Sequence, residues 1–249
     1  LEMSNGGYAY SMISYLFRAN YTFDDRYLAT ISFRRDDSSK FGSNYRAGNF
    51  PSAALGWNIA NEDWFTSTLL DRLKLRASWG QTGNEKIAYT SQFSLIDNNQ
   101  NAVFGEDETL NNGATYGKIG NPNLRWETTT QTDIGLEFGM FNNKLSVELD
   151  YFNKVTDDIL LELDIPGHQG AGDNVRTWFN AASVVNRGLE WNISWQETKG
   201  DFYYRVGFNG NTLHNEVLEV NEFTDSDEGD VLIGGSLGNG QLVTRSVKG

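Results

Sequence analysis

The chain has 249 residues, and its 13% aromatic content with only 3 prolines is too rich in large rings for a disordered or low-complexity protein. It contains no cysteine, which excludes a disulfide framework and a thiolate metal site. The formal net charge of -13 argues against a nucleic-acid partner, because phosphate binding requires a surface of lysine and arginine.

A membrane-spanning helix is also excluded, since no stretch approaches the roughly 18 to 20 apolar residues that such a helix needs. The first residues, Leu1 to Met3, do not open a charged segment followed by an apolar run, so we expect no signal peptide here. A closed β-sheet is then the one membrane structure left, because lipid tolerates only helices and barrels.

Eight segments alternate apolar and polar residues with a period of two, the pattern of a β-strand with one apolar and one polar face. In chain order they span residues 13–23, 27–35, 50–59, 73–82, 126–140, 145–155, 186–196 and 202–212. The alternation is clearest in 186–196, where Trp191 and Trp195 share one face and Glu190 lies on the other. The sequence therefore predicts an all-β protein.

The connections between these segments are alternately short and long. Residues 24–26, 141–144 and 197–201 are tight turns, in which Asn142, Asn143 and Gly200 tolerate hairpin dihedral angles. The stretches 36–49, 84–125 and 156–185, and everything after Leu213, are expected to be long loops. Residues 60–72 fall on the short-turn side but are longer, and we expect one short interfacial helix there.

This order of connections favours an antiparallel up-and-down transmembrane β-barrel, whose successive hairpins turn on opposite sides of the membrane. Aromatic residues near strand ends fit the two interfacial girdles of such barrels. They are Tyr8, Tyr10, Tyr21, Phe23, Tyr27, Trp57, Trp126, Phe141, Tyr151, Phe152, Phe202 and Tyr204. Alternation alone also fits a soluble β-sandwich.

We expect the apolar face to contact lipid, where a charge near the midplane costs roughly 2 to 4 kcal/mol. Its residues include Ile31, Phe33, Leu75, Trp79, Leu136, Phe138, Val147, Leu149, Trp191 and Trp195. We expect the other face to line a watery lumen, either as a specific contact surface or merely as a solvated wall. Its charged residues are Arg34, Lys74, Arg76, Glu127, Glu137, Glu148, Asp150, Glu190 and Arg205.

Several segments resemble the SusC/RagA family of TonB-linked outer-membrane proteins from Bacteroidota. Residues 72–84 read RLKLRASWGQTGN, and residues 120–129 read GNPNLRWETT. Similar matches, in the family's order, are 34–36 (RRD), 39–42 (SKFG), 50–54 (FPSAA), 62–65 (EDWF), 133–141, 145–160 and 186–190 (NRGLE). The resemblance covers nearly the whole chain.

The resemblance implies uptake of oligosaccharides or peptides across the outer membrane of a Gram-negative bacterium. It also implies a SusD-like lipoprotein over the extracellular mouth and energy from an inner-membrane TonB complex that acts through a region preceding Leu1. Residues 1–249 would then be about eight strands of a larger barrel whose plug, N-terminal domain and last strands lie outside this sequence. A 22-stranded barrel needs roughly fourteen more strands. The charged lumen wall would contact the plug or line the substrate path.

Candidates for cargo binding are the loop aromatics Tyr116, Trp178 and Phe179, which could stack on sugar rings or simply pack one loop on another. Trp126 fits a girdle better. The acidic stretch from Asp225 to Asp230 lacks the final glutamate of an EF-hand, which favours a solvated loop over a calcium site.

No enzyme, metal site or cofactor is expected. His168 and His214 are the only histidines and have no metal-ligand spacing, and there is neither a nucleophile elbow nor a phosphate loop. Besides the transporter, two interpretations stay open: a self-contained eight-stranded outer-membrane barrel with an adhesin or structural role, and a soluble carbohydrate-binding β-sandwich.

Overall fold

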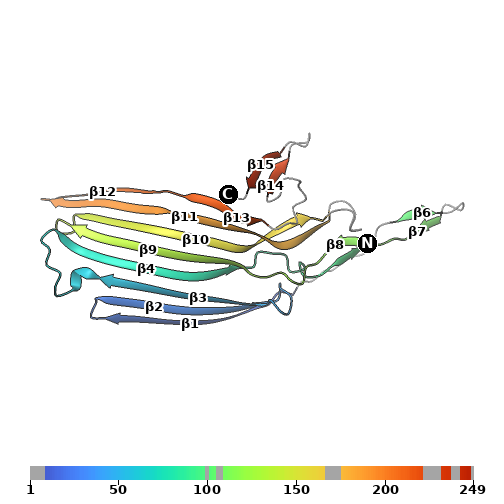
Figure 1. The fold of residues 1–249 in the computed structure, drawn as a ribbon, viewed down its shortest axis with the longest axis horizontal. Coiled ribbons are helices and arrows are strands. Elements are labelled where there is room, and N and C mark those ends of the chain that lie inside the picture. The colour runs from blue at the N-terminus through green and yellow to red at the C-terminus, as the bar shows by residue number, and fades with distance from the viewer. Residues whose placement is uncertain are drawn as a thin grey trace.

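The structure is a computed structural model that describes residues 9–98, 101–104, 109–165, 175–220, 231–236 and 242–247. Its main body is one nine-stranded antiparallel sheet, in which eight strands follow the order β1-β2-β3-β4-β9-β10-β11-β12 (Figure 1). These strands are β1 (Met12–Phe23), β2 (Tyr27–Ser38), β3 (Ala47–Asn58), β4 (Leu70–Asn84), β9 (Glu127–Met140), β10 (Leu145–Asp164), β11 (Arg176–Lys199) and β12 (Phe202–Asn211). The prediction of eight antiparallel strands in up-and-down order is confirmed.

Three smaller pairs of strands lie outside this path. β5 (Leu95–Asp97) pairs with β8 (Thr115–Lys118), β6 (Ala102–Phe104) pairs with β7 (Thr109–Asn111), and β14 (Val231–Ser236) pairs with β15 (Leu242–Val247). The ninth strand of the large sheet, β13 (His214–Val220), pairs with β11.

The tight turns have the backbone conformations that their residues favour. Asn142 and Asn143 have φ angles of 58° and 57°, and Gly200 has a φ of 62°, as expected for residues that tolerate the left-handed region. Asp24 and Asp25 in the first turn have φ angles of 51° and 50°. In Figure 1 these turns lie at one end of the sheet and the long connections at the other.

The long loop expected over residues 156–185 is largely strand. Residues 156–185 were expected to be a loop, yet β10 and β11 remain paired out to Asp164 and Arg176. The register of the β10–β11 pair shifts between Thr156 and Leu160, where Asp158 has a φ of 55°. The outer part of the hairpin is therefore offset from the part nearer the tight turns. The expectation was wrong because apolar residues no longer alternate strictly with polar ones here, as in Leu160 and Leu161, although each strand still satisfies the backbone groups of the other.

The short helix expected within residues 60–72 is not found there. The structure has a single 3-10 turn, η1 (Ile59–Asn61), and β4 already begins at Leu70. Trp64 and Phe65 follow η1 in an irregular segment. Among the described residues, no helix is both long and apolar enough to cross a membrane.

The register keeps the apolar side chains and the charged side chains on opposite faces of the sheet. Cross-strand partners share a face, and the chain of partners Lys74, Glu137, Glu148 and Asn192 runs across β4, β9, β10 and β11. All nine charged residues predicted for the lumen lie on this polar face, and all ten residues predicted to contact lipid lie on the other. Phe152 lies opposite Asp133 on the polar face, so it cannot belong to a lipid-facing girdle.

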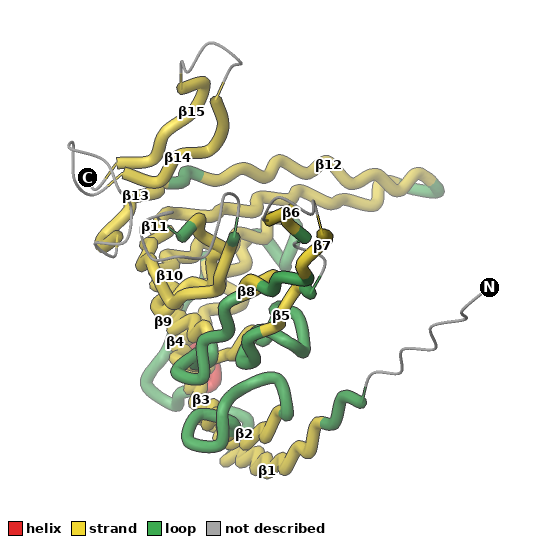
Figure 2. Tube along the Cα trace, turned by 90° about the vertical axis from the view of Figure 1, so that its right-hand side faces the viewer, coloured by secondary structure: helices red, strands yellow, loops and turns green. Residues whose placement is uncertain are grey.

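The large sheet curves into an open arc (Figure 2). β1 and β12 stand at the two ends of the strand order and do not pair within the described part of the chain, so these eight strands do not close on each other. On the apolar face, Phe17 and Leu55 are 59% and 64% exposed. No second sheet of described residues covers this face, which disfavours the β-sandwich.

The adjacent residues Asn192 and Ile193 in β11 offer a test of the two faces. We predict that Ile193→Arg destabilises the full-length protein in a bilayer by roughly 2 to 4 kcal/mol, because it places a charge on the apolar face. Asn192→Arg, on the polar face, should change stability by less than about 0.5 kcal/mol. Urea unfolding in lipid vesicles measures both, and equal effects would contradict the assignment of the apolar face to lipid.

Candidate functional site

A group of ion pairs crosses the polar face where β4, β9 and β10 lie side by side. The Arg76 guanidinium contacts a Glu137 carboxylate oxygen at 3.2 Å and donates to both carboxylate oxygens of Asp150, at 2.8 and 2.7 Å. Lys74 lies 3.6 Å from Glu137. The Arg76 side chain is 41% exposed, so these contacts are screened and worth about 0 to 1 kcal/mol each.

The remaining charges of the polar face are more dispersed. Arg34 donates from Nε to Asp36 at 2.8 Å, and Asn192 donates to Glu148 at 3.5 Å. Glu190 and Arg205 are exposed. The structure therefore brings Lys74, Arg76, Glu137 and Asp150 together, while Arg34, Glu190 and Arg205 lie apart from that group.

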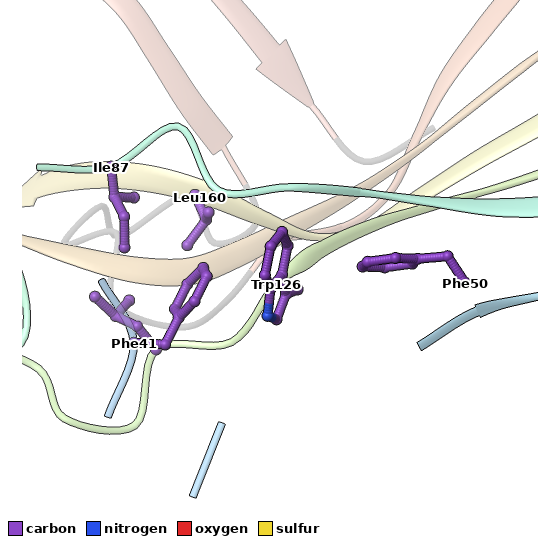
Figure 3. Close-up of a cluster of buried hydrophobic side chains, with 6 residues drawn as sticks. Phe41, Phe50, Ile87, Trp126 and Leu160 are labelled. Carbon is purple, nitrogen blue, oxygen red and sulfur yellow. The ribbon is translucent and has the colours of Figure 1, made fainter. Parts of the chain in front are cut away.

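A buried apolar cluster lies at the long-loop end of the sheet. Figure 3 shows the Trp126 indole between the rings of Phe41 and Phe50, with centroid distances of 5.1 and 5.5 Å. Ile87, Leu124 and Leu160 complete the cluster, which joins the β2–β3 connection, the β4–β9 connection and β10. Trp126 is 6% exposed, so its assignment to a girdle is wrong.

Asn180 in β11 connects the segment before β9 to the same end of the sheet. Its Oδ1 accepts from the Arg125 backbone N–H at 2.9 Å, while its Nδ2 donates to the carbonyls of Arg125 at 2.9 Å and Asp158 at 2.8 Å. Asn121 adds a donor bond to the Trp178 carbonyl at 3.0 Å. The amide thus replaces the strand partner that Arg125 lacks.

The connections at this end are packed too closely for larger residues. Gly42, which is buried, lies where an added Cβ would overlap the backbone carbonyl of Pro122. The side chain of Thr177 also donates to the Ile119 carbonyl. Segments 39–46, 119–126 and 175–180 therefore form one packed unit above the polar face.

Below this unit, the polar face of β1 to β4 and β9 encloses a hollow of about 710 Å³. Phe50 and Trp126 lie on its border, and polar side chains such as Arg18, Ser32 and Gln131 line its wall.

The three aromatic residues predicted to bind cargo do not come together as one surface. Tyr116 lies in β8 of a separate small sheet and is 49% exposed. Trp178 and Phe179 are half-buried neighbours in β11, and Trp178 packs against the buried cluster. Contact of these residues with cargo stays a prediction, and packing is the role that the structure shows for Trp178.

An aromatic row occupies the short-turn end of the apolar face. Tyr21, Phe23, Tyr27 and Trp57 follow one another with centroid distances of 6.5 Å, and Trp64 meets Trp57 edge-on at 6.3 Å. This is the arrangement expected of an interfacial girdle.

Glu62 anchors that row. Its side chain is 6% exposed, and its Oε1 accepts from the Tyr27 hydroxyl at 2.7 Å and from the Trp57 indole N–H at 2.8 Å. Arg26 lies 3.4 Å from Oε2. The bond from Tyr27, followed by that from Trp57, holds the pKa of the Glu62 carboxyl below its usual value, because both donors stabilise the carboxylate.

Sequence reasoning missed Glu62, Asn180 and Arg18. Glu62 lies in the EDWF segment, but nothing in its spacing shows that its carboxylate meets two aromatic donors. Asn180 fell in an expected loop. Arg18 could have been predicted, because the alternation of residues 13–23 places it on the polar face with Asn20.

Two of the weaker sequence hypotheses lie outside the described residues. They concern the acidic stretch from Asp225 to Asp230 and His168. Across the residues that are described, no group of three or more histidine, aspartate or glutamate side chains is arranged to hold a metal ion.

A family model for the TonB dependent receptor-like β-barrel matches residues 4–245. The chain belongs to the TonB-dependent receptors. It is 38% identical over 226 residues to TonB-dependent receptor P39 of Formosa agariphila, covering 89% of this chain and 21% of that protein. With TonB-dependent receptor SusC of Bacteroides thetaiotaomicron it shares 36% identity over 224 residues, covering 87% of this chain and 22% of SusC. The chain thus spans about a fifth of the length of these relatives.

Solved structures agree with this assignment. The RagAB peptide importer in its "open-open" state matches with a TM-score of 0.78 and 29% identity, over 96% of this chain and 24% of that chain. The siderophore receptor PirA of Pseudomonas aeruginosa matches at 19% identity and a TM-score of 0.51, over 89% of this chain and 38% of that chain, which shows a shared fold. The resemblance to the SusC/RagA family is confirmed.

Asn180→Leu should loosen the long-loop end of this receptor. The change removes three hydrogen bonds and leaves the Arg125 and Asp158 backbone groups without those partners, at a cost of about 1 to 3 kcal/mol. We expect faster cleavage by added protease between residues 119 and 126 in intact cells. Asn209→Leu, an exposed amide in β12, is the control and should cleave like wild type.

Glu62 gives a pH dependence with a defined sign. Because its folded-state pKa is lowered, Glu62 contributes stability above the unfolded glutamate pKa of about 4.3, and this contribution is lost as pH falls through the folded pKa. Glu62→Gln should therefore be less stable than wild type at neutral pH and lose less stability on acidification below about pH 4.

Thermal unfolding of the detergent-solubilised full-length protein across pH measures this difference. Asp25→Asn, an exposed residue of the same end, is the control and should follow the wild-type curve. Parallel curves for Glu62→Gln and wild type would show that the Glu62 carboxylate is not stabilised by its two donors.

Proposed function

We propose that this chain is part of the barrel wall of a SusC-like importer in the outer membrane of a Gram-negative bacterium. The observation that carries the proposal is the exposed apolar face of a family-typical antiparallel sheet, on which Tyr15 and Phe17 of β1 are 66% and 59% exposed. Lipid is the environment in which such a face is stable, and the charged face then borders water.

The importer takes up oligosaccharides or peptides, draws energy from TonB and works with a SusD-like lipoprotein. One relative is named SusC, and one structural neighbour is described as a peptide importer, which supports this class of cargo. Residues 1–249 provide wall and loops, while plug and TonB contact belong to other parts of the receptor. The wall has no catalytic task in this function, so the receptor binds and moves its cargo unchanged.

The packed unit of segments 39–46, 119–126 and 175–180 supports the lipoprotein in this proposal. It holds three connections in a fixed arrangement at the long-loop end, which is the outer end of the barrel. The ion pairs of Arg76 with Glu137 and Asp150 face inward and fix the charge pattern that the plug meets.

The function is tested by deleting the gene and measuring growth on defined oligosaccharides and on peptides as sole sources of carbon or nitrogen. We expect growth to fail on one class of cargo and to return when the full-length gene is restored. In the same strain the product should sediment with outer membranes. Normal growth on every cargo, or recovery of the product in the soluble fraction, would falsify the proposal.

A further inference from the structure

The dipeptide Asn-Gly occurs four times in the chain, and two of its copies lie in the described residues. Asn112–Gly113 follows directly after β7, whereas Asn209–Gly210 lies inside β12. Both asparagine side chains are exposed, and both glycines are half-buried. The two copies therefore share their sequence and their exposure and differ in the backbone structure that contains them.

An asparagine followed by glycine loses its side-chain amide without an enzyme. The backbone nitrogen of the glycine gives up its proton to solvent and attacks Cγ of the asparagine. A new C–N bond closes a succinimide ring, while the C–N bond of the side-chain amide breaks and ammonia leaves. Water then opens the ring at either carbonyl, which yields aspartate or isoaspartate. Glycine favours ring closure because it has no Cβ to shield its nitrogen and its backbone rotates freely.

The sheet opposes this reaction at Asn209. Ring closure requires the asparagine backbone to leave the extended conformation of a strand, so that the glycine nitrogen reaches Cγ. Asn209 pairs with Asn192 of β11, and Gly210 pairs with Trp191. A Cβ on Gly210 would lie 2.7 Å from the Trp191 indole, so this peptide is packed against a large ring. The strand pair must open before Asn209 can react.

The backbone around Asn112 has no such restraint among the described residues. Residues 112–114 form an irregular connection between β7 and β8, which have 3 and 4 residues. Each of these strands belongs to a two-stranded sheet, and such ribbons are only marginally stable by themselves. Figure 1 shows β6 and β7 extending beyond the large sheet at its long-loop end. Rotation of the backbone at Asn112 therefore disrupts little structure.

We propose that Asn112 is a site of non-enzymatic deamidation in the folded receptor and that the wall protects Asn209. The reaction consumes water and needs no cargo, partner or energy source, so it is independent of the importer function. Its products place a new carboxylate close to Leu110, an apolar residue that is 64% exposed. Isoaspartate also lengthens the main chain between β7 and β8 by its Cβ. The receptor thus gains a charge at its long-loop end that its gene does not encode.

The test incubates the full-length receptor in detergent, in mildly alkaline heavy-oxygen water, and then digests it in ordinary water. Mass spectrometry measures the deamidated fraction of the peptides that contain Asn112 and Asn209. The heavy oxygen marks carboxylates that formed during the incubation. We expect Asn112 to react at least about tenfold faster than Asn209, because an opening step precedes the reaction in β12. In the receptor unfolded in urea, both sites should react at similar rates.

Gly113→Ala is the matched variant, because its Cβ hinders ring closure at Asn112 and leaves β12 unchanged. It should slow deamidation of Asn112 and leave that of Asn209 as in wild type. Labelling by an isoaspartate-specific methyltransferase should detect the product at position 112 in wild type and far less of it in the variant.

Three results overturn the proposal. The first is an Asn112 that stays intact or reacts no faster than Asn209 in the folded receptor. The second is a rate ratio in urea as large as that in the folded receptor, which would assign the difference to the neighbouring sequence. The third is aspartate without isoaspartate at position 112, which would indicate direct hydrolysis of the amide instead of ring closure.

Discussion

The rest of the molecule depends on the pleat of its hydrogen-bonded strands, which sends successive side chains to opposite sides of the sheet. Because partners across the strands share a face, a slip of one residue in any pair would exchange the two faces of that strand. Arg76 bonds to Asp150 across an intervening strand, which holds three strands in one register. The charges of the wall therefore help to keep its apolar face apolar.

The sequence predicted most of this wall because the wall follows one local rule. Alternation located the eight long strands, and the asparagine pair at 142 and 143 marked a turn that has the expected backbone. Once β10 is located, the two-residue period alone puts Glu148 on the polar face and Leu149 on the apolar face. The family resemblance added two predictions that the alternation cannot give, the number of strands in the whole barrel and the role of that barrel.

The long-loop end was predicted less well because its contacts are non-local. Trp126 carries the same local signal as a girdle residue, and it is buried only because Phe41 of the β2–β3 connection and Phe50 of β3 pack against it. Asn180 looks like any loop asparagine until Arg125, 55 residues away, presents an unpaired peptide group. Trp178 was expected to be available to cargo, yet the same packing covers part of it.

The length of β11 has a mechanical consequence. A tilted strand needs about 9 to 11 residues to cross a bilayer, and β11 has 24, so more than half of it stands outside the hydrocarbon. Its outer edge is shared between β12 and β13, and at the junction Gly188 lies against the Thr212 carbonyl, with no room for a Cβ. A force on the outer hairpin would pass along β11 into the wall, and residue 188 is the point at which the strand beside β11 changes from β13 to β12.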